Sequence, residues 1–125
     1  MRTSYRGEDV TLLLKDITGL VQPLDTRARE ARIQAGVHYC EMLPAEYVPT
    51  ARYIEAYERA LACEAGRTAA AVRACADKIL AAKGPGVVLV SLARAGLPIG
   101  ILLRWYLKKQ YGIDVPHYDI SIIRG

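Results

Sequence analysis

The chain has 125 residues, 52% of them hydrophobic, and a formal net charge of +4. That length and composition suit one ordinary domain with a real core and argue against a disordered chain. A positive charge favours anionic partners, but the basic residues are spread along the chain and never form a run of four. No stretch interleaves aromatic with basic side chains, so we do not expect nucleic-acid binding.

The cysteines and histidines further limit the class of protein. Three cysteines and two histidines at wide spacings do not form a structural zinc site or a disulfide framework. The N-terminal residues lack the apolar core of a signal peptide, and no apolar run approaches the roughly 18 residues of a membrane span. These features predict a cytoplasmic protein without a membrane partner.

The chain before residue 50 predicts little regular structure. Val10–Leu14 is apolar enough for a short strand. Leu14–Gly19 faintly resembles a phosphate-cradling strand end, but its single acidic residue favours a turn. The charged stretch Pro23–Gly36 is either a solvated arm or a short helix, and Val37–Pro49 is predicted as an extended loop. We therefore divide the chain into an arm and loop, residues 1–49, and a second part, residues 50–125.

Helical spacing begins at residue 50. Thr50 is a good N-cap for an amphipathic helix that extends to about Cys63. Gly66 is expected to interrupt it, and a second, alanine-rich helix follows over Arg67–Ala82. Cys63 and Cys75 are interpreted as small core residues.

The last forty residues predict a strand, a helix and a second strand. Gly86–Leu92 is a continuous apolar run, typical of a parallel strand that is buried on both faces. A helix over Ile99–Tyr111 ends before Gly112, and a strand follows over His117–Ile123. This order predicts an α/β fold with a parallel sheet, flanking helices and a right-handed crossover. Because two such strands do not make a stable sheet alone, we expect the remainder of the same polypeptide to complete it. The sequence is also compatible with a homo-oligomer and does not determine the oligomeric state.

The turn after the first of these strands is the best candidate for binding an anion. Ligands of open α/β folds collect at the carboxyl ends of the strands. Gly96 can take a positive φ, Pro98 suits the first helical position, and free amides at the start of the helix attract negative charge. Arg94 adds a bidentate fork for phosphate or carboxylate. The alternative is an ordinary turn whose arginine faces water. Familiar nucleotide-binding glycine motifs are absent.

A second candidate site surrounds Cys40. An extended backbone would place His38 and Cys40 on one side, with Glu41 and Glu46 nearby. A thiolate nucleophile needs a base within hydrogen-bond reach, which could be His38 or His117. The alternative is a partly buried cysteine in a loop that packs on the sheet.

Several stretches together resemble one bacterial family, the phosphoribosyltransferase-like proteins of tellurite-resistance and stress gene clusters, also labelled cysteine protease StiP. The resemblance rests on His38–Glu46 (HYCEMLPAE), Pro49–Tyr53 (PTARY), Val88–Gly100 (VLVSLARAGLPIG) and His117–Gly125 (HYDISIIRG). It extends over most of the chain from about residue 10, and members of the family continue well beyond residue 125.

The resemblance implies two activities. A type I phosphoribosyltransferase-like fold would hold the pyrophosphate of an anionic phosphoribosyl substrate, with Mg²⁺ assisting, at Ser91, Ala93, Arg94, Ala95 and Gly96. The protease label implies a nucleophilic cysteine, for which Cys40 with His38 is the positional candidate. However, the family pattern has serine at the positions of Cys40 and Thr50, so a shared catalytic cysteine would lie beyond residue 125 or not exist. A non-catalytic binding or assembly module is the third alternative.

Overall fold

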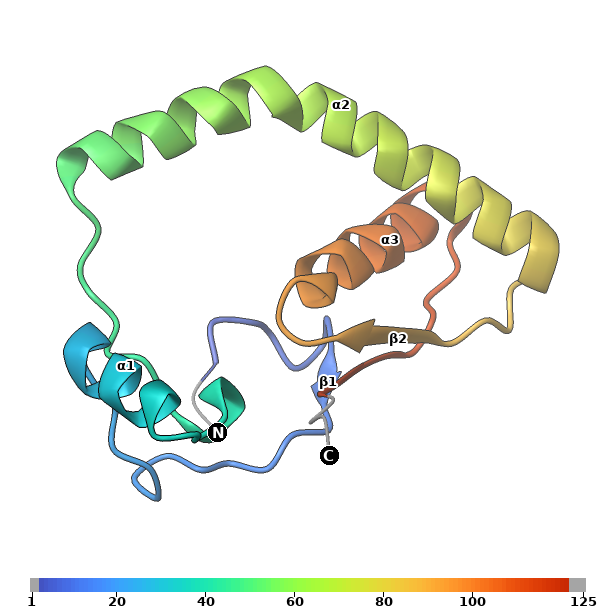
Figure 1. Ribbon diagram of the computed structural model, residues 1–125. Coiled ribbons are helices and arrows are strands. Elements are labelled where there is room, and N and C mark those ends of the chain that lie inside the picture. The colour runs from blue at the N-terminus through green and yellow to red at the C-terminus, as the bar shows by residue number, and fades with distance from the viewer. Residues whose placement is uncertain (1–2, 122–125) are drawn as a thin grey trace.

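The structure is a computed structural model that describes residues 3–121, and its centre is a three-stranded parallel sheet (Figure 1). The strands are β1 (Thr11–Leu12), β2 (Leu89–Leu92) and β3 (His117–Ile120), in the order β1-β3-β2. The predicted α/β class and the parallel pairing are confirmed. The predicted end of the last strand, at residues 122 and 123, lies outside the described residues.

Helix α3 (Gly96–Tyr111) joins β2 to β3 and lies at the centre of the core. Some of its buried side chains pack against β1, and others pack against α2 (Ala51–Lys83). The helix ends as predicted, because Gly112 takes a left-handed φ of 70°. The predicted start was wrong: α3 begins at Gly96, so Pro98 is its third residue and not its first. The prediction of a positive φ at Gly96 was also wrong, because that residue is helical.

The two main clusters of buried side chains both include α3. The larger one joins α3 to the second half of α2 and to the starts of β2 and β3, through Val72, Ala76, Leu89, Leu103, Leu107 and Val115. The smaller one joins α3 to β1, through Val10, Leu97 and Ile101. The apolar side chains of α3 therefore hold the sheet and the long helix together.

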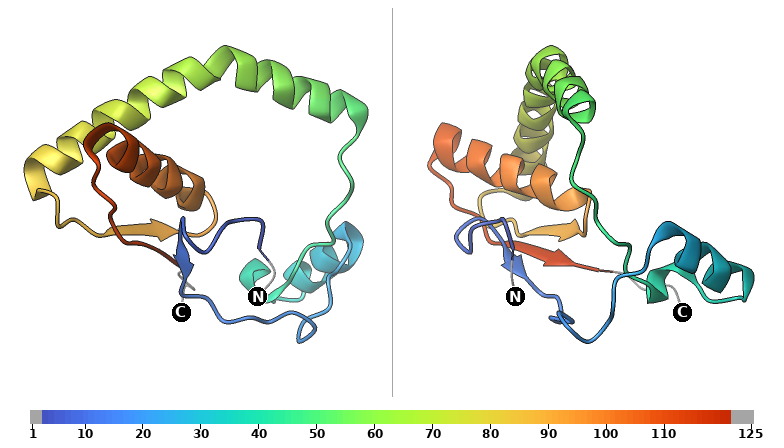
Figure 2. Two further views of the ribbon diagram at one scale, coloured as in Figure 1. Left: turned by 180° about the vertical axis from the view of Figure 1, so that it is seen from behind. Right: turned by 90° about the vertical axis from the view of Figure 1, so that its left-hand side faces the viewer.

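Helix α2 is continuous over 33 residues, so the predicted interruption at Gly66 was wrong. Thr50 caps it as expected, since its hydroxyl accepts a hydrogen bond from the backbone N–H of Tyr53. A glycine in a helix costs about 1 kcal/mol relative to alanine, which the neighbouring alanines outweigh. Figures 1 and 2 show that the second half of α2 lies over α3, while its first half extends away. Within α2 the buried residues are Val72 and Ala76.

This packing corrects the prediction for two cysteines. Cys63 and Cys75 are both exposed and are not core residues. Cys63 lies in the half of α2 that does not pack on α3. Cys75 precedes the fully buried Ala76, and consecutive helical residues point about 100° apart.

Strand β2 is buried on one face only. Leu89 and Ser91 point inward, whereas Val88, Val90 and Leu92 are 50%, 59% and 46% exposed. The prediction of burial on both faces was therefore wrong for the residues that the structure describes. Apolar composition alone does not tell which face of a strand is covered.

The segment between β1 and α2 contains helix α1 (Thr26–Gln34) and the 3₁₀ helix η1 (Tyr39–Glu41). Of the two alternatives for Pro23–Gly36, the short helix is the one observed. Asp25 caps α1 by accepting a hydrogen bond from the N–H of Ala28, and α1 has no buried residues. The predicted turn lies at the end of Leu14–Gly19, over residues 18–20, where the N–H of Thr18 donates to Asp16 and that of Leu20 donates to the carbonyl of Ile17.

Candidate active site

Cys40 and His38 form a close pair on an exposed turn. The turn is the 3₁₀ helix η1 rather than the extended backbone that the sequence suggested, and His38 is its N-cap. Nδ1 of His38 lies 2.9 Å from Sγ of Cys40. The alternative of a partly buried cysteine was wrong, because the Cys40 side chain is exposed.

The backbone of Cys40 contacts the same imidazole nitrogen. The backbone N–H of Cys40 also points at Nδ1 of His38, at 3.4 Å, and an N–H can only donate. In the tautomer that carries its proton on Nε2, Nδ1 has a lone pair and can accept the thiol proton. A nucleophile and a base within hydrogen-bond reach is the basic arrangement of nucleophilic catalysis.

Backbone pairing holds the turn in place. Leu24 donates to the carbonyl of Leu43 and accepts from the N–H of Ala45, each at 2.8 Å. Met42, directly after η1, is 5% exposed and anchors the turn. These hydrogen bonds join the chain before α1 to the chain after η1. They hold the surface loop that carries Cys40 and His38 in a fixed position, and functional residues commonly lie on loops fixed in this way.

Other residues considered for this site lie apart from the pair. Glu41 and Glu46 are exposed, and neither forms a hydrogen bond with His38 among residues 3–121. The second candidate base, His117, is 3% exposed in the sheet. Its Nε2 lies 2.6 Å from Oγ of Ser91 and its Nδ1 lies 3.1 Å from the carbonyl of Asp9. Both of its nitrogens are therefore occupied in the core.

The predicted anion-binding loop lies at the carboxyl end of β2, as expected. Arg94 and Ala95 are exposed, Ala93 and Gly96 are half-buried, and the peptide bond between Ala93 and Arg94 is cis. Ser91, the other residue of the predicted set, is 7% exposed and shares its hydroxyl with His117.

Sequence analysis missed the most unusual polar residue, Asp119. Its side chain is fully buried at the carboxyl end of β3, beside Ser91 in register, and neither carboxyl oxygen has a hydrogen-bond partner. Burial raises the pKa of this carboxyl, and nearby His117 opposes the shift only in part. The available signal was an acidic residue in phase with His117 on an otherwise apolar strand.

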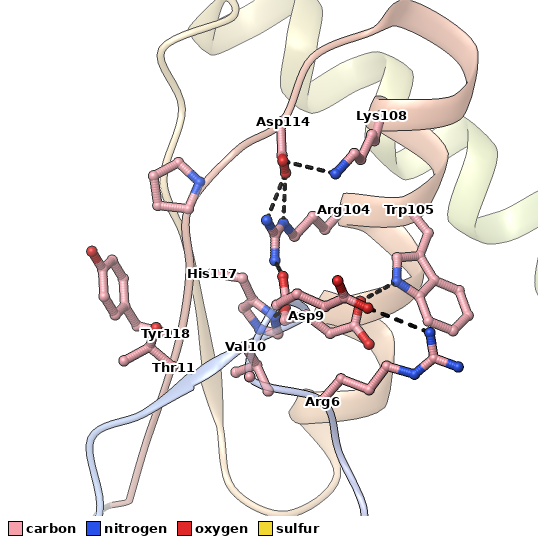
Figure 3. A pocket seen from close by; sticks show the side chains of 13 residues that line it. Arg6, Asp9, Val10, Thr11, Arg104, Trp105, Lys108, Asp114, His117 and Tyr118 are labelled. Carbon is pink, nitrogen blue, oxygen red and sulfur yellow. Dashed lines mark hydrogen bonds and ion pairs between the residues drawn. The ribbon is translucent and has the colours of Figure 1, made fainter.

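A cavity of about 470 Å³ lies at the opposite, amino end of the sheet (Figure 3). Asp114 bridges Arg104 and Lys108 there, with N–O distances of 2.6 and 2.9 Å. Lys108 and then Arg104 lower the pKa of Asp114. Nε1 of Trp105 donates to Asp9 at 2.6 Å. Because these charged groups pair with one another, they are not available to bind a charged ligand. The hydrogen bond from Trp105 to Asp9 links the N-terminal turn to α3.

The described part of the chain offers neither a metal-binding cluster nor a membrane-spanning helix. Within residues 3–121, no group of three or more histidine, cysteine or acidic side chains is arranged to hold a metal ion. Over the same residues, no helix combines the length and apolar character needed to cross a membrane.

The family model described as "Tellurite-like stress resistance cysteine protease StiP" matches residues 3–125, and the chain belongs to this family. It is 41% identical over 122 residues to the protein named Cysteine protease StiP of Acinetobacter baylyi (strain ATCC 33305 / BD413 / ADP1). The match covers 97% of this chain and 31% of that protein, so the chain spans about a third of its relative's length. No solved structure matches.

The comparisons confirm the resemblance to the StiP family. They support the protease alternative better than the phosphoribosyltransferase one, because both descriptions name a cysteine protease and neither names a transferase. The phosphoribosyltransferase-like fold has no support from a solved structure.

Proposed function

We propose that the chain carries the nucleophile and base of a stress-response cysteine protease, with Cys40 as nucleophile and His38 as base. The observation that carries this proposal is the 2.9 Å approach of Nδ1 to an exposed Sγ. The description of the family and the name of the relative support the same chemistry.

In the proposed reaction, Nδ1 of His38 takes the thiol proton as Sγ of Cys40 attacks a peptide carbonyl. The imidazolium returns that proton to the departing amine, which leaves a thioester on Cys40. Water then attacks the thioester, the imidazole accepts its proton, and the acid product leaves as the thiol is restored. Each proton taken up by His38 is thus given back within one turnover.

Thiol reactivity offers a test with controls inside the same molecule, because Cys40, Cys63 and Cys75 are all exposed. Iodoacetamide labelling followed by mass spectrometry should modify Cys40 at least about tenfold faster than the other two. His38→Ala should reduce the rate at Cys40 to that of Cys63. Equal rates at all three cysteines in the unaltered protein would contradict the proposed pair.

Peptide cleavage by the full-length protein tests the role of the thiol. Cys40→Ala should remove cleavage, and His38→Ala should lower kcat by about 10²- to 10⁴-fold, the usual contribution of a general base. Cys63→Ala and Cys75→Ala are matched controls that should retain full activity. Full cleavage by Cys40→Ala would place the nucleophile elsewhere in the protein, as the serine in the family pattern implied.

A second candidate function is binding of a phosphoribosyl substrate with Mg²⁺ at Ser91, Ala93, Arg94, Ala95 and Gly96. It is favoured by the position of this loop at the carboxyl end of β2, where the amides of α3 begin. Titration of phosphoribosyl pyrophosphate and Mg²⁺ into the full-length protein tests it. Saturable binding that Arg94→Ala weakens by about 1.5 to 3 kcal/mol would support it, and no binding at millimolar ligand would exclude it.

A further inference from the structure

Asp119, whose carboxyl is buried, is one of the residues that line a small cavity at the carboxyl end of the sheet. The cavity has a volume of about 250 Å³, smaller than the usual site for a drug-sized ligand. Its lining comes from β1 and the residue after it, from the β2–α3 loop, from α3, from β3 and from the N-terminal turn: Thr3, Tyr5, Leu12, Leu14, Ala93, Arg94, Leu97 and Asp119. It is distinct from the turn that carries Cys40 and does not depend on the proposed protease activity.

The lining combines two opposite charges with an apolar wall. Asp119 is fully buried, and both of its oxygens are without a partner in the structure. Arg94 is exposed and forms no hydrogen bond or ion pair within residues 3–121. The same lining includes the leucines Leu12, Leu14 and Leu97.

This lining selects the chemistry of the ligand. A buried carboxyl needs a donor, and an ammonium supplies the strongest one, since charge-assisted hydrogen bonds are about twice as strong as neutral ones. A polyanion, such as the phosphoribosyl substrate of the second candidate function, would lie against a buried carboxyl, so this cavity and that function exclude one another. Arg94 can accommodate one carboxylate, and the leucines accommodate a small aliphatic group.

We propose that this cavity binds a small apolar α-amino acid, with the ammonium on Asp119, the carboxylate on Arg94 and the side chain against the leucines. Burial raises the pKa of Asp119 because its charged form has no partner there, and a bound ammonium would supply that partner. The ligand is thus a zwitterion whose two charges match the two ends of the cavity.

Three related ligands test the proposal on the unaltered full-length protein, by isothermal titration calorimetry. L-Leucine has both charged groups, leucinamide has the ammonium alone, and 4-methylpentanoate has the carboxylate alone. Leucine should bind saturably and at least about tenfold more tightly than either of the other two. No saturable heat from leucine at millimolar concentration would overturn the proposal, and this arm needs no variant to fold.

Two substitutions then assign each charge to its residue. Asp119→Asn should weaken leucine and leucinamide by at least about tenfold and leave 4-methylpentanoate unchanged. Arg94→Ala should weaken leucine and 4-methylpentanoate and leave leucinamide unchanged. Arg52→Ala, an exposed arginine on α2, is the matched control and should change none of them.

Other results would overturn the assignment. Equal leucine affinity in Asp119→Asn and the unaltered protein would remove the carboxyl from the site. Binding of inorganic pyrophosphate that Arg94→Ala weakens, without any binding of leucine, would make the loop a phosphate site instead.

Discussion

Gly100 in α3 leaves no room for a side chain. A Cβ built on Gly100 would lie 2.3 Å from both Nε2 of His117 and Oγ of Ser91. The absence of a side chain therefore lets α3 approach the buried hydrogen bond between these two residues, whose atoms are 2.6 Å apart. The position matters because the other ring nitrogen of His117 lies 3.1 Å from the carbonyl of Asp9, so a displaced His117 would also lose this contact.

We expect Gly100→Ala to lower the free energy of unfolding by about 1 to 3 kcal/mol, because the added methyl group must displace Ser91 or His117. Urea denaturation followed by circular dichroism measures the change. Gly86→Ala is the control, because a Cβ at Gly86 meets nothing within 4 Å. Equal stability of Gly100→Ala and the unaltered protein would show that the helix shifts freely at this point.

Asp119 gives a pH-dependent prediction at the same scale. Burial raises its pKa above the ordinary 3.8, so the folded chain holds this proton more tightly than the unfolded chain. The stability that this protonation supplies is complete below about pH 3.8 and is lost as the pH rises through the raised pKa.

Asp119→Asn, which stays neutral, should therefore be more stable than the unaltered protein at neutral pH, by about 1 to 3 kcal/mol. The difference should shrink towards zero as the pH falls to about 4. Thermal melts across this range check both statements. A difference in stability that does not change with pH would show that Asp119 does not titrate as its burial requires.

At the scale of elements, the continuity of α2 through Gly66 makes a prediction with a definite sign. Gly66 is exposed and helical, and a Cβ there would meet no atom within 4 Å. Gly66→Ala should therefore raise stability by about 0.5 to 1 kcal/mol, because alanine loses less backbone freedom in a helix. A less stable Gly66→Ala variant would instead support the interruption of the helix at Gly66 that the sequence predicted.

Elements that depend on local chemistry could be predicted from the sequence. Thr50 as an N-cap and Gly112 as the end of α3 depend only on their neighbours, and both were placed correctly. The proximity of His38 to Cys40 was suggested by their spacing, although the backbone there is 3₁₀ and not extended. The burial of Asp119 could not be predicted, because it depends on residues distant in sequence that come together only in the fold.

The prediction that Cys63 is a core residue failed for a similar reason. Helical periodicity identifies an apolar face but does not tell which part of a long helix has a partner. Nothing near Cys63 in the sequence marks the point at which α2 leaves α3, since that point is set by the shorter length of α3.

At the scale of the whole molecule, the uneven packing of α2 should appear in its dynamics. Amides before Gly66 lie in the half that extends away from α3, whereas those near Ala76 belong to the main core. Hydrogen exchange measured by NMR should show the earlier amides exchanging at least about tenfold faster. Uniform protection along α2 would mean that another copy of the chain, or another part of the protein, covers its first half in solution.

The strand order β1-β3-β2 also has a consequence during synthesis. Among residues 3–121, β1 pairs with β3 alone, and the paired residues Thr11 and Tyr118 are 107 positions apart in the sequence. A ribosome that adds about 5 to 20 residues per second needs about 5 to 20 seconds between the two strands. Throughout that interval the nascent β1 has no sheet to join, so this segment should be a preferred binding site for chaperones near the ribosomal exit tunnel.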